Sequence, residues 1–130
     1  CTVDIGQTIL DRAQVEPYNG IQGRSLVNAI NNRKDPEAVD SIIVEDDQQR
    51  VYFGYKNPPR IRTLITDRYR LTVSRGEDWG ELYDRENDPI EMENLFDDPR
   101  YSGVRAELFE KLALRQIELV DTSPMPTMRA

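Results

Sequence analysis

Histidine is absent from this sequence of 130 residues. Histidine is the commonest general acid or base near neutral pH, so Ser-His-Asp and Cys-His catalysis within the chain are excluded. The single cysteine, Cys1, allows neither a disulfide within the chain nor a cysteine metal cluster. The chain therefore lacks the residues on which much enzyme chemistry depends.

Long apolar runs and an excess of basic residues are also missing. No run approaches the roughly 18 residues of a membrane span, and no basic segment followed by an apolar one opens the chain. The formal charge is -7, from 24 acidic and 17 basic residues, which argues against nucleic acid and gives no support for a membrane surface as partner. A removed signal would leave no trace, so the cytoplasm, the periplasm and the outside of the cell all stay open.

The first third of the chain has helical patterning. Residues 3–13 predict a helix, since one side of it gathers the apolar side chains Val3, Ile5, Ile9, Leu10 and Ala13. Ser25 is a candidate N-cap for a second, short helix that runs towards Ile30. The polar stretch 31–37 is the best internal boundary.

The pattern changes to period two from residue 41. Strands are predicted at residues 41–45, 51–55, 60–66, 69–73 and 81–84, with polar turns between them. The turn at residues 66–68 is short enough only for a tight hairpin. Such short strands with short connections predict an antiparallel sheet of about four strands.

A long helix is predicted to follow Asp98, which can cap it, with Pro99 at its first position. It should run to about residue 120 with an apolar stripe broken only by Gln116: Val104, Leu108, Phe109, Leu112, Ala113 and Val120. The stripe must pack on something, and the sheet is the obvious partner. The predicted fold class is α+β, a small antiparallel sheet packed against a long C-terminal helix and preceded by a separate helix.

One segment, residues 80–99, joins a strand ending in Leu-Tyr-Asp to two Asp-Pro turns, with Asn94, Leu95 and Phe96 as an apolar plug between them. It resembles the region near the C-terminus of the sulfatases, the arylsulfatase-type sulfuric ester hydrolases of the alkaline-phosphatase-like superfamily. Residues 2–13, 21–26 and 62–71 resemble the same family in the same order. The resemblance covers nearly the whole chain and implies the C-terminal portion of a sulfatase.

The resemblance also implies a division of the chain. Residues 1–33 would be the terminal helix of the sulfatase α/β core plus a linker, residues 34–121 the C-terminal subdomain, and residues 122–130 a tail. The expected partners are the N-terminal catalytic portion of the same sulfatase and, through the full-length protein, a sulfate ester. An isolated fragment should leave the apolar side of residues 3–13 without its partner, so self-association is expected.

Calcium and formylglycine are implied only for the full-length enzyme. The family makes formylglycine from the cysteine of a Cys-x-Pro-Ser-Arg motif, whereas Cys1 is followed by Thr2, Val3 and Asp4. We expect no cofactor, no metal and no catalytic residue in this chain, which alone should be inactive.

Two clusters are candidates for bordering a substrate pocket. Glu45, Asp46 and Asp47 follow a predicted strand; their oxygens suit calcium, but consecutive carboxylates converge poorly. The resemblance implies that loops of the small subdomain border the pocket mouth, which leaves substrate contact or a solvated loop for this segment. Arg60 and Arg62 share one strand face, where they can bind a sulfate or pair with acidic side chains of a neighbouring strand.

Further residues have two interpretations each. Arg68 and Arg70 offer the same choice between an anion and cross-strand pairing. Trp79, with Tyr83 and Tyr52, either stacks on a sugar or aryl group or closes a small core. Two other functions stay open for the chain: a free-standing non-catalytic binding module, and the C-terminal part of a related phosphonate or phosphate ester hydrolase.

Overall fold

The computed structural model describes residues 1–18, 20–32, 39–51 and 54–119. The chain divides into two compact units, Cys1–Ala38 with Val120–Ala130, and Val39–Leu119. The predicted tail, Tyr52 and most of the predicted boundary segment lie outside the described residues. The proposed division into residues 1–33, 34–121 and 122–130 stays a prediction.

In the first unit, the described residues form the helices α1 (Val3–Arg12) and α2 (Val27–Asn32). The Asp4 carboxylate accepts a hydrogen bond from the Arg24 backbone N–H at 3.0 Å, and the Thr8 hydroxyl accepts one from the Leu26 N–H at 3.0 Å. Ser25 lies two residues before α2, and its hydroxyl accepts from the N–H of Val27, the first residue of the helix, at 3.2 Å. These bonds from α1 side chains hold the segment that leads into α2.

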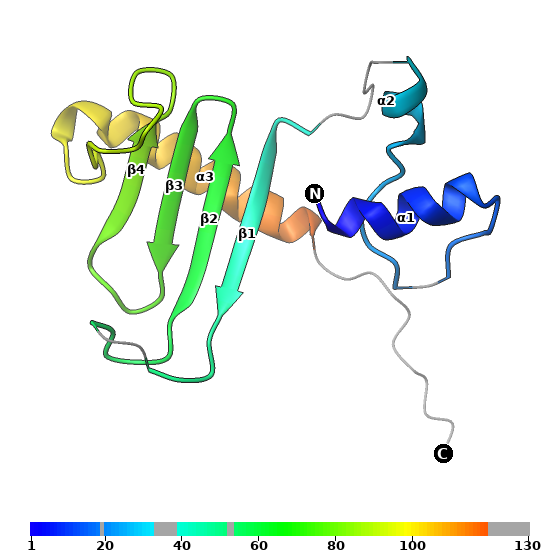
Figure 1. The fold of residues 1–130 in the computed structure, drawn as a ribbon. Helices are drawn as coiled ribbons and strands as arrows, with labels where there is room; N and C mark the ends of the chain where they lie inside the picture. Colours follow the sequence, from blue (N-terminus) through cyan, green and yellow to red (C-terminus); the bar gives the residue numbers. More distant parts are fainter. Residues whose placement is uncertain (19, 33–38, 52–53, 120–130) are drawn as a thin grey trace. The chain divides into compact units, whose positions relative to one another are not determined.

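The second unit is a four-stranded antiparallel sheet in the order β1-β2-β3-β4, with a helix across one face (Figure 1). The strands are β1 (Ser41–Asp47), β2 (Arg60–Thr66), β3 (Tyr69–Ser74) and β4 (Gly80–Asp84). A short 3-10 helix, η1 (Pro99–Tyr101), leads into the long helix α3 (Ser102–Glu118). The predicted α+β architecture, with the sheet packed against the C-terminal helix, is confirmed.

One row of leucines forms the centre of this unit. Leu64, Leu71 and Leu82 are paired across β2, β3 and β4 and have no exposed surface. Leu95 and two leucines of the predicted helical stripe, Leu108 and Leu112, complete the buried cluster. Burial of one such side chain stabilises the fold by roughly 1.5–3 kcal/mol, so this row holds the helix on the sheet.

Residue 98 begins the last helical segment as the sequence predicts. The Asp98 carboxylate accepts from the Arg100 backbone N–H at 2.9 Å, and Pro99 follows at the first position.

The face of the sheet opposite to the leucine row is more exposed to water. On it, Ile42 and Val44 of β1 are 41% and 49% exposed.

The strand predicted at residues 51–55 is wrong for the residues that are described. Val51, Gly54 and Tyr55 lie outside any strand, in the connection from β1 to β2. Gly54 has φ +94°, in the left-handed region that breaks an extended run. β1 instead continues two residues beyond its predicted end, to Asp47, which pairs with Arg60.

Candidate substrate-bordering site

The predicted acidic and basic clusters meet on the paired strands β1 and β2. The register places Glu45 opposite Arg62 and Asp47 opposite Arg60. Arg62 joins the group: its Nε lies 2.9 Å from Glu45 Oε1, and its Nη1 lies 2.9 Å from Asp47 Oδ1. Arg60 Nη1 lies 3.1 Å from Asp47 Oδ2. The cross-strand pairing that the sequence allowed is therefore present.

The ion pairs among Glu45, Asp47, Arg60 and Arg62 favour the charged forms of Asp47 and Arg62. Hydrogen bonds from Arg62 lower the pKa of Asp47, and the same bonds raise the pKa of Arg62. The Arg62 side chain is 23% exposed, whereas Arg60 is 51% exposed. Both guanidinium groups are already paired, so an anion at this position would share them with the carboxylates.

Asp46 does not join the other four predicted residues. Successive side chains of a strand point to opposite faces, so Asp46 lies on the face opposite to Glu45 and Asp47. Its carboxylate accepts a hydrogen bond from Gln48 Nε2. The structure thus brings together Glu45, Asp47, Arg60 and Arg62 and leaves Asp46 apart.

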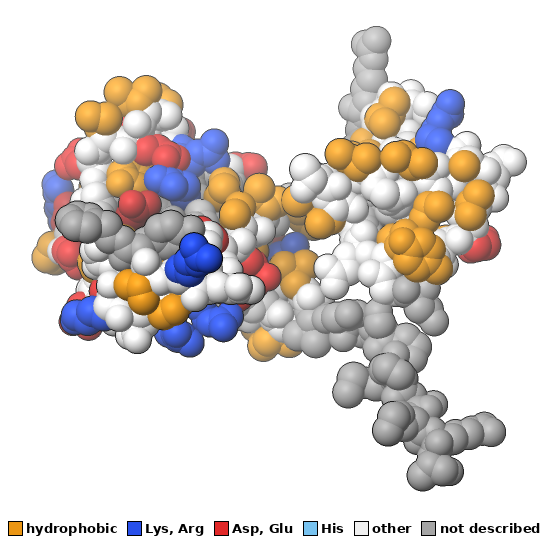
Figure 2. Space-filling model, turned by 60° about the horizontal axis from the view of Figure 1, so that its bottom comes forward, with side chains coloured by type: hydrophobic (Ala, Val, Ile, Leu, Met, Phe, Trp, Pro, Cys, Tyr) orange, Lys and Arg blue, Asp and Glu red, His pale blue; other side chains and the backbone are white. Residues whose placement is uncertain are grey.

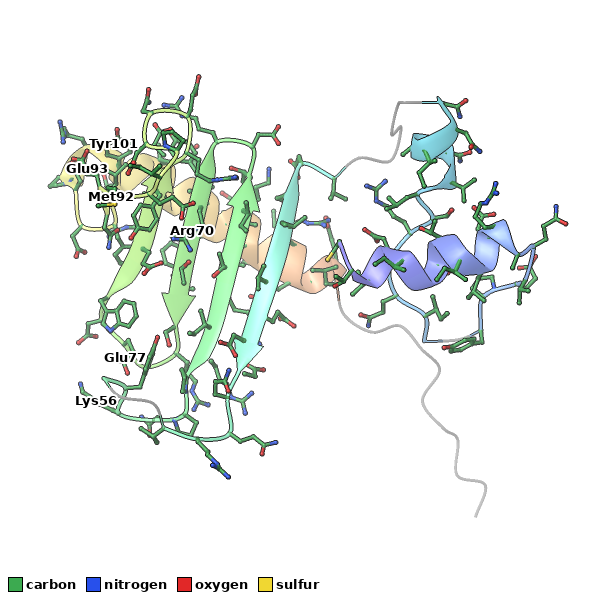
Figure 3. The ribbon with its side chains drawn as sticks, in the orientation of Figure 1. Lys56, Arg70, Glu77, Met92, Glu93 and Tyr101 are labelled. Carbon is green, nitrogen blue, oxygen red and sulfur yellow. The ribbon has the colours of Figure 1, made fainter. Side chains whose placement is uncertain are left out.

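A hollow of about 460 Å³ adjoins this network at the end of the sheet where β2 begins and β3 ends. Arg60 and Arg62 line one part of it, and Trp79 of the β3–β4 loop lines another. Phe96 and Phe109 complete the apolar part. Figure 3 shows Glu77 and Lys56 on loops at this same end, while Arg70 lies further along the sheet. Sequence reasoning had assigned Phe109 and Phe96 to core packing, and only the long-range folding of the chain shows that they line a hollow.

Trp79 has a different neighbour from those predicted. Its ring lies 5.8 Å from that of Tyr55, tilted by 53°. Tyr83 instead lies under Arg70, whose guanidinium carbon is 4.9 Å from the ring centroid. Trp79 remains 44% exposed, so it does not close a core.

The second predicted arginine pair binds carboxylates at separate places. Arg68 Nη2 lies 2.7 Å from Asp84 Oδ2, and Arg70 Nη2 lies 2.8 Å from Glu91 Oε2. Arg70 also lies 3.5 Å from Glu81. The two side chains therefore anchor loops to the sheet instead of forming one anion site.

Cys1 is exposed, and its amino group donates to the Asp4 carboxylate at 2.9 Å. Within the described residues, no three His, Cys, Asp or Glu side chains are grouped so that they could hold a metal ion. The donor set here does not fit calcium, and Cys1 lacks the motif that formylglycine requires. No helix in the described part of the chain is long and apolar enough to span a membrane.

A family model and two curated relatives connect this chain with the sulfatases. The model of the family described as N-sulphoglucosamine sulphohydrolase, C-terminal, matches residues 1–118. The uncharacterized sulfatase YidJ of Escherichia coli (strain K12) is 31% identical over 113 residues, which are 85% of this chain and 21% of that protein. The N-acetylglucosamine-6-O-sulfatase of Bacteroides thetaiotaomicron is 30% identical over 130 residues, 94% of this chain and 22% of that protein. The chain thus spans about a fifth of the length of these relatives.

Solved structures match over a similar part. The structure of BT4656 in complex with its substrate D-glucosamine-2-N,6-O-disulfate has a TM-score of 0.74 and 27% identity, and the match covers 93% of this chain and 24% of that one. The phosphonate monoester hydrolase of Agrobacterium radiobacter has a TM-score of 0.79 and 25% identity, with 92% and 25% covered.

Proposed function

The chain belongs to the family of C-terminal portions of N-sulphoglucosamine sulphohydrolases, and from this membership we propose that it completes a sulfatase whose catalytic residues lie in an N-terminal portion. The observation that carries the proposal is the family match over residues 1–118. The proposed reaction of the full-length protein is hydrolysis of a sulfate monoester. Sulfated glucosamine is the proposed substrate class, because the family and one relative are named for glucosamine derivatives, and the substrate in the BT4656 structure is a glucosamine disulfate.

The proposed partner surface begins with helix α1. Val3, Ile5 and Ile9 are 52%, 54% and 61% exposed, as expected for an apolar helix side that lacks its partner. An apolar side of a helix that is left in water usually marks an interface. We assign this side of α1 to contact with the N-terminal catalytic portion, and in its absence to self-association.

The sheet offers a second apolar surface for the same partner. Ile42 and Val44 of β1 are exposed on the face that points away from the leucine row. Both surfaces support a structural role, in which the chain packs on the catalytic portion and helps to hold it folded.

The proposed pocket-bordering residues are Glu45, Asp47, Arg60 and Arg62, with Asp46 on the opposite face of the strand. Their mutual ion pairs support the role, since they bring four charged side chains together at one place on the sheet. This cluster would contact the substrate and would not react with it.

The chemistry is proposed to lie outside this chain. Formylglycine would supply the nucleophile and calcium would bind the sulfate group in the full-length enzyme. The sequence holds no formylglycine motif and the described residues hold no metal-binding group, so no step is assigned to this chain. With no histidine in 130 residues, they also lack the commonest proton-transfer group.

Activity assays on the full-length protein and on the 130-residue chain test this function. The full-length protein should release sulfate from a sulfated glucosamine, and the chain alone should release none. Replacement by alanine of the cysteine in an upstream Cys-x-Pro-Ser-Arg motif should abolish the release. A full-length protein without that motif and without sulfate release would refute the proposal.

A second candidate is a phosphonate or phosphate ester hydrolase. The match to the phosphonate monoester hydrolase of Agrobacterium radiobacter, at 25% identity, favours it. A full-length protein that cleaves a phosphonate monoester faster than the sulfate ester would establish this alternative.

A further inference from the structure

Phe96 lines the hollow at the end of the sheet and is held in place by its neighbours. The ring of Phe96 lies against Gly80, where a Cβ atom would stand only 2.3 Å from Phe96 Cε2. The rings of Phe96 and Phe109 meet edge to face, with centroids 6.4 Å apart. The Arg105 guanidinium carbon lies 4.8 Å from the centroid of Phe96. These contacts fix Phe96 from several sides.

Two aromatic side chains that line the hollow remain open to water. Trp79 is 44% exposed and Phe109 is 40% exposed. An exposed aromatic ring in a concave surface can bury the apolar face of a flat or ring-shaped ligand. A volume of about 460 Å³ is within the range of small-ligand sites, which runs from roughly 300 to 1,000 Å³.

Both donors and acceptors line the rest of the hollow. Arg60, Arg62 and Arg75 supply cations, while Glu77 and Asp78 of the β3–β4 loop supply carboxylates. Carboxylates accept hydrogen bonds from hydroxyl groups, and guanidinium groups bind sulfate or carboxylate with two parallel bonds. Figure 2 turns this end of the sheet forward and shows Lys and Arg side chains at the lower edge of the second unit, next to hydrophobic side chains.

Arg75 differs from the two arginines of β2. Arg60 and Arg62 are paired with Asp47, whereas no ion pair of Arg75 is found among the described residues. Its backbone N–H donates to the Arg60 carbonyl at 3.0 Å, which holds its backbone beside the hollow. An anionic group that enters the hollow would therefore meet Arg75 without displacing a carboxylate from it.

We propose that this hollow binds one pyranose unit of an anionic glycan, with the sugar ring on Trp79 and Phe109 and its sulfate on Arg75. Glu77 and Asp78 accept hydrogen bonds from the sugar hydroxyls. The ligand class rests on the proposed function, in which the full-length protein acts on sulfated glucosamine. Two of its lining residues, Arg60 and Arg62, also belong to the proposed pocket-bordering set, whereas Trp79, Phe109 and Arg75 have no part in the proposed reaction.

Fluorescence gives a specific test, because Trp79 is the only tryptophan of the chain. The 130-residue chain is titrated with an N-sulfated, 6-O-sulfated glucosamine disaccharide, with its desulfated counterpart, and with sodium sulfate. The sulfated disaccharide should produce a saturable change in Trp79 emission. The desulfated sugar should bind at least about tenfold more weakly, as expected for the loss of a charge-assisted pair.

Variants separate this site from general charge attraction. Arg75→Gln should weaken the sulfated disaccharide by about tenfold, and Phe109→Ala should weaken both sugars. Arg12→Gln, which removes the same charge from helix α1, should leave the affinity unchanged. Thermal unfolding of each variant shows that the fold is retained.

The assignment would be overturned by no saturable emission change, by equal affinity for both disaccharides, or by equal weakening through Arg75→Gln and Arg12→Gln. A response to sodium sulfate as strong as that to the disaccharide would also overturn it, since the sugar would then contribute nothing. Failure of the proposed function would appear elsewhere, as missing sulfate release by the full-length protein. Either failure can occur without the other.

Discussion

Arg68 donates two hydrogen bonds to the carboxylate of Asp84, from Nη2 to Oδ2 at 2.7 Å and from Nε to Oδ1 at 3.1 Å. Asp84 ends β4, is 2% exposed, and also accepts from Asn87 Nδ2 at 2.9 Å and from the Glu86 backbone N–H at 3.2 Å. One buried carboxylate therefore joins the β2–β3 turn to the loop that leaves the sheet.

Replacing Asp84 by alanine should destabilise the chain by about 2–3 kcal/mol, since hydrogen bonds to a charged group are lost and a buried site is emptied. Urea denaturation followed by circular dichroism measures the change. Asp67→Ala is the matched control, because Asp67 is an exposed residue of the neighbouring turn. An equal effect of both substitutions would contradict the role assigned to Asp84.

The stability of the fold should depend on the ionisation of Asp84. Hydrogen bonds from Arg68 lower the pKa of Asp84 from 3.8 to about 2. Because the folded state has the lower pKa, the ionised carboxylate stabilises the fold above about pH 4, and this contribution is lost as the pH falls from about 4 to about 2. The difference in urea midpoint between wild type and Asp84→Asn should be constant from pH 5 to 7 and shrink towards pH 2. A difference that is independent of pH would contradict it.

The Asn94 side chain makes hydrogen bonds with the backbone of β4 that a neighbouring strand would otherwise make. Its Oδ1 accepts from the N–H groups of Leu82 at 3.0 Å and Phe96 at 3.1 Å, and its Nδ2 donates to the Gly80 carbonyl at 3.0 Å. Asn94→Ala should cost roughly 1–3 kcal/mol, because buried backbone groups lose their partners. Hydrogen exchange should accelerate at the amides of Leu82 and Phe96. Asn57→Ala, at an exposed position, should leave both amides protected.

Gly80 should tolerate no side chain. A Cβ atom there would lie 2.3 Å from the ring of Phe96, so Gly80→Ala should cost about 1–3 kcal/mol through displaced packing. Gly103→Ala is the control, since nothing lies within 4 Å of the new atom and alanine favours a helix. Phe96→Leu should reduce the penalty of Gly80→Ala in a double-mutant cycle. Simple additivity of the two changes would show that they do not meet.

The apolar side of α1 should affect association more than stability. Ile5→Ser combined with Ile9→Ser should change the unfolding free energy by less than about 1 kcal/mol, since surface substitutions are usually within ~0.5 kcal/mol each. Sedimentation velocity should show less self-association than in wild type, and Arg12→Ser should not show this decrease. Unfolding of the double variant would instead mean that these side chains are buried within the chain.

The elements that the sequence predicted well are those with local signals. Alternation around Leu71 predicted β3, and the Asp98–Pro99 pair predicted the start of the last helical segment. The β-branched and aromatic run at residues 51–55 suggested a strand, but that pattern cannot show that Gly54 takes a positive φ.

The site was only partly predictable, because local sequence patterns do not show which distant residues meet. Strand pairing of Glu45 with Arg62 follows from the register, which a sequence with clear alternation restricts. The hollow depends on Trp79, Phe96 and Phe109 meeting across long stretches of chain, and no local pattern encodes that meeting. Asn94 is a second example, since nothing in a turn sequence reveals that its side chain hydrogen-bonds the backbone of β4.

Asn94 and its neighbours cover one edge of the sheet, so a further strand could pair with the sheet only at the other edge. The backbone N–H of Leu95 donates to the Leu82 carbonyl at 2.8 Å, so the outer edge of β4 is closed by the chain itself. In the described part of the chain, β1 has a paired strand on one side only. Any added strand, from a second molecule or an aggregate, would therefore have to join at β1. Three of its seven residues, Glu45, Asp46 and Asp47, carry negative charge, a device that discourages edge-to-edge polymerisation.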